Sequence, residues 1–117
     1  METFRHTKRV DEVEAKATLR AGDYYFNLPV NNLSLGGVFL EGFLRDSQLP
    51  RKCELDLHFK NGLSIESLDV EFVHDRVERG KPERTGSGFK FTDLNQSIKE
   101  KLYSAISDDS HKLHYIY

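Results

Sequence analysis

The sequence has few of the features that are typical of secreted proteins, of membrane-inserted proteins or of proteins that bind nucleic acid non-specifically. A single cysteine, Cys53, excludes an internal disulfide and fits a reducing compartment such as the cytoplasm. No apolar run approaches the ~20 residues that cross a bilayer, and the N-terminus is charged, so neither membrane insertion nor a signal peptide is expected. The 17 basic and 19 acidic residues nearly cancel, to a net charge of -2. We therefore expect no general binding of DNA or RNA, and any anion site must be local.

Alternating apolar and polar residues fill most of the chain, which is typical of half-buried strands. The 117 residues suit one domain. Strands are predicted near 13–19, 24–30, 38–40, 53–59, 63–72 and 89–91. Asn61-Gly62 predicts a tight hairpin between the fourth and fifth strands. The apolar positions of the fifth strand change from odd to even numbers, so a β-bulge is expected near Glu66 and Ser67.

A helix is predicted after the strands. It begins at Asp93, which has capping-box spacing to Gln96, and ends at Asp108 and Asp109, which oppose the negative end of the helix dipole. Its apolar face carries Leu94, Ile98, Leu102, Ala105 and Ile106. This order favours a mainly β fold, a closed six-stranded antiparallel β-barrel with a C-terminal α-helix. The expected parts are a basic arm at 1–9, the barrel with its helix at 10–107, and a tail of unsettled structure at 108–117.

A polar and glycine-rich stretch, residues 31–37, connects the second and third predicted strands. Asn32 and Ser34 are expected to point outward, while Leu33 and Leu35 of the same alternation point inward. Gly36 and Gly37 permit unusual backbone angles and close approach of another group. Taken alone, this composition is explained best as a turn with a glycine bulge.

The N-terminal segment is locally basic, with Arg5, Lys8 and Arg9 against Glu2. Arg5 and Arg9 share one face in either a helical or an extended conformation, so their guanidinium groups can converge on one anion. The alternative is a solvated terminus without a ligand.

No combination of residues in the sequence predicts catalysis. Ser34 lacks the flanking glycines of a nucleophile elbow. Gly86-Ser87-Gly88 begins like a dinucleotide fingerprint, but Phe91 stands where a third glycine belongs. The five histidines are scattered, so no metal site is predicted. We expect a protein that is not an enzyme and has no cofactor.

Together, the arm and the polar stretch resemble the PilZ domain family. That family has an Arg-x-x-x-Arg motif before its first strand and an Asp/Asn-x-Ser-x-x-Gly motif between its second and third strands. Arg5 and Arg9 match the first motif, and Asn32, Ser34 and Gly37 match the second. The resemblance extends to about Ile106 and implies a PilZ-like split barrel. It also implies a receptor for the bacterial second messenger cyclic di-GMP.

The resemblance further implies which side chains contact this ligand. Arg5 and Arg9 can each bind a phosphate or the O6/N7 edge of guanine. Asn32 and Ser34 can bind a guanine edge or a ribose, and Gly37 lets the ligand lie against the backbone. Weaker candidates are Gly36, Lys8 and a residue late in the fifth strand that stacks on guanine, either His74 or Arg76.

The expected signalling mechanism is that cyclic di-GMP orders the arm over the barrel and changes a surface for a downstream protein, in a process such as motility or biofilm formation. The alternative is an adaptor of the same fold that binds its partner without nucleotide. Phe4 precedes Arg5 where many family members have another arginine, so one or two ligands per site are both open. The protein is expected to be a monomer or weak dimer.

Overall fold

The computed structural model describes the backbone of residues 15–113 and the side chains of residues 15–107. The predicted arm, residues 1–9, and the last four residues lie outside this range. The elements are β1 (Ala15–Ala21), β2 (Tyr24–Leu33), β3 (Gly37–Glu41), β4 (Lys52–Phe59), β5 (Ser64–Arg76), η1 (Pro82–Arg84), β6 (Gly86–Phe91) and α1 (Gln96–Leu113). The η1 element is a single turn of 3-10 helix.

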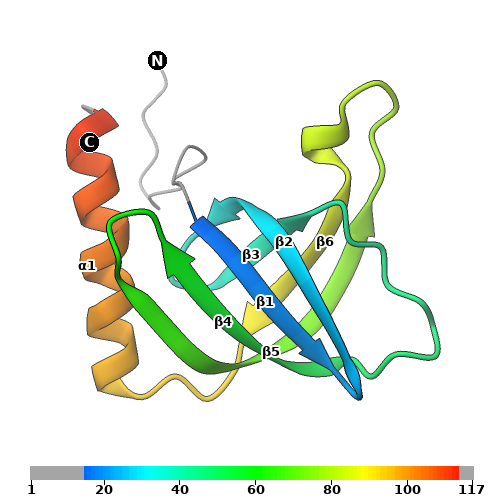
Figure 1. Ribbon diagram of the computed structural model, residues 1–117, viewed down its shortest axis with the longest axis horizontal. Coiled ribbons are helices and arrows are strands. Elements are labelled where there is room, and N and C mark those ends of the chain that lie inside the picture. Colours follow the sequence, from blue (N-terminus) through cyan, green and yellow to red (C-terminus); the bar gives the residue numbers. More distant parts are fainter. Residues whose placement is uncertain (1–14, 114–117) are drawn as a thin grey trace.

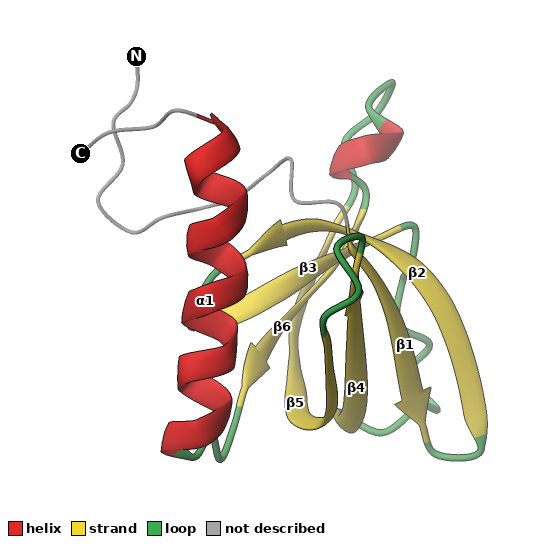
Figure 2. Ribbon diagram, turned by 60° about the vertical axis from the view of Figure 1, so that its left-hand side comes forward, coloured by secondary structure: helices red, strands yellow, loops and turns green. Residues whose placement is uncertain are grey.

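The six strands close into an antiparallel barrel in the order β1-β2-β3-β6-β5-β4 (Figure 1). Strands β1 to β3 form one meander and β4 to β6 form another. The two meanders join along β3 and β6 on one side and along β1 and β4 on the other. The helix α1 stands alongside the barrel, and η1 projects from the far side (Figure 2). The predicted barrel with a C-terminal helix is confirmed.

Alternate strand residues point inward and form the core. The fully buried leucines are Leu19, Leu33, Leu40, Leu55, Leu57, Leu68 and Leu102. Leu102 belongs to α1, and with Ala105 and Ile106 it fastens the helix to the barrel. Burying one such leucine stabilises the fold by about 1.5–3 kcal/mol. Cys53 is also a member of this core, and its burial raises the pKa of the thiol.

The expected bulge in β5 is confirmed. Leu55 pairs with Leu68 and Leu57 with Ile65, so one residue of β4 faces two of β5. Ser67 has a positive φ of 60°, and its amide donates to Asp56 Oδ1 at 2.8 Å. The bulge keeps both apolar sets of β5 facing the core, which is why the alternation changes phase along the sequence.

Both ends of the predicted helix are wrong. The helix begins at Gln96, and the Ile98 amide donates to Asn95 Oδ1 at 2.8 Å, so Asn95 is the N-cap. Asp93 lies before the helix with φ 56°. At the other end the helix continues to Leu113, across the expected boundary at residue 108. An unfavourable dipole interaction of about 0.3–1 kcal/mol does not stop a helix that gains a backbone hydrogen bond with each added residue.

Candidate functional site

The polar stretch between β2 and β3 forms a turn organised by Ser34. The Ser34 amide donates to the Gly37 carbonyl at 3.0 Å, and its hydroxyl accepts from the Gly36 amide at 3.1 Å. Leu33 is fully buried as expected, but Leu35 is 46% exposed. The prediction for Leu35 is wrong because β2 ends at Leu33. The strand alternation no longer applies within the turn.

The two glycines of this turn have different surroundings. A Cβ on Gly37 would lie 2.3 Å from the Phe89 carbonyl oxygen, so the missing side chain lets β3 approach β6. Gly36 is exposed, and a Cβ there would meet nothing closer than Ser34 Oγ at 3.7 Å. Gly37 therefore has a role in closing the barrel, whatever binds at the turn.

The register of the barrel brings Asn32 and His74 into one row. Asn32 pairs with Phe39, Phe39 with Gly88, and Gly88 with His74. Cross-strand partners point to the same face of a sheet. The neighbouring row, Leu33, Val38, Phe89 and Phe72, lies in the core, so the first row points outward. We call the surface around Asn32, Phe39, Gly88 and His74 the outer face.

Two bulges produce this alignment. The ladder between β2 and β3 shifts at Asn31, and the ladder between β5 and β6 shifts at Val73. Each extra residue reverses the direction of the side chains that follow it. Without these bulges, Asn32 and His74 would not share a face with Phe39.

The floor of the outer face is aromatic and glycine-lined. Phe39 is 8% exposed although it points away from the core, and the Arg76 guanidinium lies 5.1 Å from its ring centroid. The His74 ring lies over Gly88, where an added Cβ would be 3.1 Å from Cε1. Phe39 is not among the site residues that the sequence predicts. Its signal is three consecutive apolar residues, Val38 to Leu40, where strict alternation predicts one outward polar residue.

The outer face has a boundary at each end. The Ser34 turn follows Asn32 at one end. At the other end, Arg76 pairs with Gly86, and the loop with η1 begins there. The side-chain amide of Asn31 donates to the Glu83 carbonyl of η1 at 2.7 Å. The result is a surface of mixed aromatic, imidazole, amide and guanidinium groups, which suits a flat polar ligand with hydrogen-bonding edges.

Comparison with known proteins gives a result at the level of structure. No protein-family model matches the sequence, and no curated protein matches it. Among solved structures, the chain is similar to the PilZ domain with c-di-GMP of YcgR from Escherichia coli, with a TM-score of 0.63. The match covers 97% of this chain and 100% of that chain at 15% identity. This chain has the PilZ fold.

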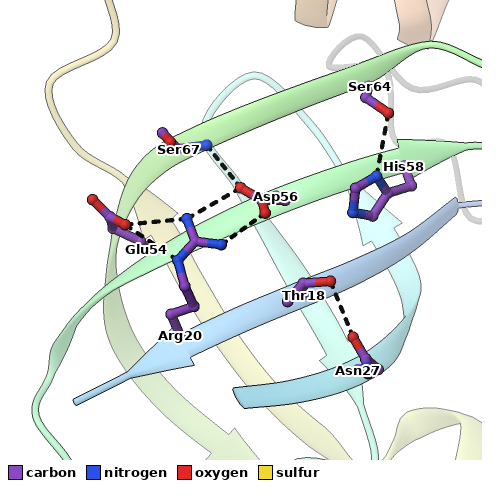
Figure 3. Close-up of polar contacts among 8 residues, drawn as sticks. All are labelled: Thr18, Arg20, Asn27, Glu54, Asp56, His58, Ser64 and Ser67. Atoms are coloured by element: carbon purple, nitrogen blue, oxygen red, sulfur yellow. Dashed lines mark hydrogen bonds and ion pairs between the residues drawn. The ribbon is translucent and has the colours of Figure 1, made fainter. Parts of the chain in front are cut away.

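A second polar cluster lies across the PilZ barrel, on β1, β4 and β5 (Figure 3). Arg20 binds Asp56 through Nη1 and Oδ2 at 2.7 Å and binds Glu54 at 3.1 Å. The hydrogen bond from Arg20 lowers the pKa of Asp56, and Asp56 raises the pKa of Arg20. Each of these charges is satisfied by a neighbour. We interpret the cluster as a brace between β1 and β4 and not as a ligand site.

Among the described residues of the PilZ fold, no group of three or more His, Cys, Asp or Glu side chains is placed to hold a metal ion. Among residues 15–113, no helix combines the length and the apolar character that crossing a membrane requires. Arg5, Lys8 and Arg9, the predicted arm residues, lie outside the described residues.

Proposed function

We propose that this protein belongs to the PilZ family and is a receptor for cyclic di-GMP, which it binds on the outer face. The observation that carries the proposal is the row that places Asn32 and His74 on one outward surface. The solved PilZ domain with the same fold contains c-di-GMP. Both motifs of the family occur in this sequence in the expected order.

The outer face offers groups for each part of a cyclic dinucleotide. The His74 ring is positioned to stack on a guanine, with Gly88 beneath it leaving room for a flat contact. The Ser34 hydroxyl accepts from Gly36, so its own proton remains to donate to ligand. The Asn32 amide has no hydrogen-bond partner among the described residues. It can therefore bind a guanine edge or a ribose, which both offer donors and acceptors.

Arginines supply the charge that balances the two phosphates. Arg5 and Arg9 bind phosphate or guanine edges by charge-assisted hydrogen bonds, each worth ~1.5–3 kcal/mol. Arg76, held against Phe39, offers another guanidinium at the same surface. Binding then orders residues 1–9 over the barrel and changes the surface that a downstream protein reads. The protein acts in the cytoplasm as a receptor and leaves the nucleotide intact.

Isothermal titration with cyclic di-GMP tests this proposal. We expect saturable binding by the full chain, and loss of about tenfold or more in affinity for Arg9→Ala and His74→Ala. Asn27→Ala is the matched control, because Asn27 lies on β2 but accepts a hydrogen bond from Thr18 of β1, the strand on the side of β2 away from β3. It should bind as the unmodified protein does. Absence of binding, or equal affinity in all variants, would overturn the proposal.

The same titration separates the alternatives left open by the sequence. The molar ratio at saturation shows whether one or two ligands bind at each site. A nucleotide-independent adaptor gives no heat with cyclic di-GMP. Chromatography of the nucleotide after incubation checks that no linear product forms.

A further inference from the structure

The loop between β5 and β6 carries an excess of positive charge. Residues 76–86 contain four basic and two acidic side chains, a net charge of +2 in a chain whose overall charge is -2. The Arg84 guanidinium lies 3.5 Å from the Glu78 carboxylate, so these two charges compensate each other. Arg79 and Lys81 are exposed, and neither has an acidic partner among the described residues.

Hydrogen bonds fold this loop into a compact turn. The turn of η1 is closed by the Arg84 amide donating to the Lys81 carbonyl at 2.8 Å. The Glu78 amide donates to the Thr85 hydroxyl at 3.1 Å, which joins the two sides of the loop. The charges of Arg79 and Lys81 are therefore carried on a hydrogen-bonded segment.

The loop is also hydrogen-bonded to strands that carry the outer face. Asn31 Nδ2 donates to the Glu83 carbonyl at 2.7 Å, and the Gly42 amide donates to the Thr85 carbonyl at 2.7 Å. Asn31 is the bulge residue directly before Asn32. One side chain thus links η1 to the position where the proposed ligand site begins.

We infer that this loop is a cationic wall of the cyclic di-GMP site, that Arg79 and Lys81 attract the ligand phosphates, and that Asn31 is the positioning residue that holds the wall. The inference rests on the proposed function and adds residues outside both sequence motifs. Its physical basis is the attraction between exposed charges and a dianion within about a Debye length, ~10 Å at 0.1 M salt. Salt screens that attraction strongly, whereas it screens partly buried contacts on the floor of the outer face much less.

The first test compares charge variants by titration with cyclic di-GMP. Removing both charges in Arg79→Gln/Lys81→Gln should weaken binding about three- to tenfold at ~0.05 M NaCl and less at ~0.5 M NaCl. The matched control is Lys99→Gln/Lys101→Gln, which removes the same charge from α1. Both views place that helix across the barrel from η1 (Figures 1 and 2). Affinity equal to that of the control, or a loss that salt does not reduce, would overturn the inference.

The second test concerns Asn31. Asn31→Ala should expose the η1 amides to faster hydrogen exchange and weaken binding severalfold, with a smaller salt dependence than the unmodified protein. In this background, Arg79→Gln/Lys81→Gln should have less effect than it has alone, because coupled residues are not additive. Full additivity would show that Asn31 does not act through the loop, which would overturn its assigned role.

The two proposals fail in different ways. If the unmodified protein does not bind cyclic di-GMP, the proposed function is wrong. If it binds, and Arg9→Ala abolishes binding while the loop variants leave affinity and salt dependence unchanged, the proposed function stands and the cationic wall is wrong.

Discussion

Arg20 and Asp56 form a two-pronged ion pair between neighbouring strands, with Nη1 to Oδ2 at 2.7 Å and Nη2 to Oδ1 at 3.2 Å. Asp56 Oδ1 also accepts the amide of Ser67, the bulge residue of β5. One carboxylate therefore joins β1, β4 and β5. Its side chain is 17% exposed, so the carboxylate is partly open to water.

Asp56→Ala should destabilise the protein by about 2–3 kcal/mol, because it leaves Arg20 without its main partner and a bulge amide without an acceptor. Glu54→Ala removes the other carboxylate near Arg20. Because the Glu54 side chain is 51% exposed, this change should lower the free energy of unfolding by less than about 1 kcal/mol. Urea unfolding monitored by circular dichroism measures both. Equal losses of unfolding free energy for the two variants would contradict the interpretation of Asp56 as the centre of a brace between the strands.

The same carboxylate should make stability depend on pH. The pKa of Asp56 is lowered in the folded protein, so its stabilisation is present above the unfolded value of about 3.9. It is lost as the pH falls through the lower folded value. The difference in unfolding free energy between the unmodified protein and Asp56→Asn should therefore be largest near neutral pH and shrink below about pH 4. A constant difference from pH 7 to pH 2 would refute this.

Gly37→Ala and Gly36→Ala should behave differently although the residues are adjacent. A Cβ at position 37 meets the Phe89 carbonyl at 2.3 Å, so β3 and β6 must separate, at a cost of about 1–3 kcal/mol or more. Position 36 has room, and its substitution should change stability by less than about 0.5 kcal/mol. Thermal unfolding distinguishes them, and similar melting temperatures would contradict the close approach of the strands.

Gly88→Ala should weaken cyclic di-GMP binding by displacing the His74 ring, whose Cε1 would lie 3.1 Å from the new methyl group. We expect a loss of about fivefold or more, and less destabilisation than for Gly37→Ala, because a side chain moves more easily than backbone. Titration of Gly88→Ala, His74→Ala and the double variant checks this. The double variant should match His74→Ala, and an independent additional loss would exclude His74 as the cause.

Asn95→Ala should destabilise α1 by about 1 kcal/mol, since Asn95 caps the Ile98 amide. Asn95→Ser keeps a capping oxygen and should restore most of this loss. Thermal unfolding followed at 222 nm measures both. If Gln96→Ala rather than Asn95→Ala lowered the melting temperature, the capping box predicted from Asp93 would be the better description.

The sequence predicts the barrel well because strand alternation is a local signal. Even the bulge at Ser67 is visible, because it changes the phase of large apolar residues on both sides. The bulge at Asn31 changes the phase in the same way, from Val30 at an even position to Leu33 at an odd one. It is missed because the polar and glycine-rich residues around it are explained as a turn. The end of α1 is missed for another reason, because an unfavourable dipole interaction is too weak to stop helix propagation.

The candidate site is only partly predictable for a related reason. Asn32 and Ser34 are recognised by their spacing, and His74 by its place late in a strand. Whether Asn32 and His74 share a face depends on the register of three strand pairs and on two bulges, which no local pattern specifies. Phe39 and Asn31 are missed because an outward aromatic and a bulge anchor are defined by their partners, Arg76 and Glu83.

The two-meander topology has a consequence for how the chain reaches its native state. Pairing within each meander links residues close in sequence, whereas β3 with β6 and β1 with β4 link residues on either side of the long β3–β4 connection. Contacts of high sequence separation are slow to form. Closure of the barrel, by pairing of β3 with β6 and of β1 with β4, should therefore be the late, rate-limiting step of folding. Because the outer face spans one of those boundaries, from β3 to β6, the proposed ligand surface is complete only after β3 and β6 have paired.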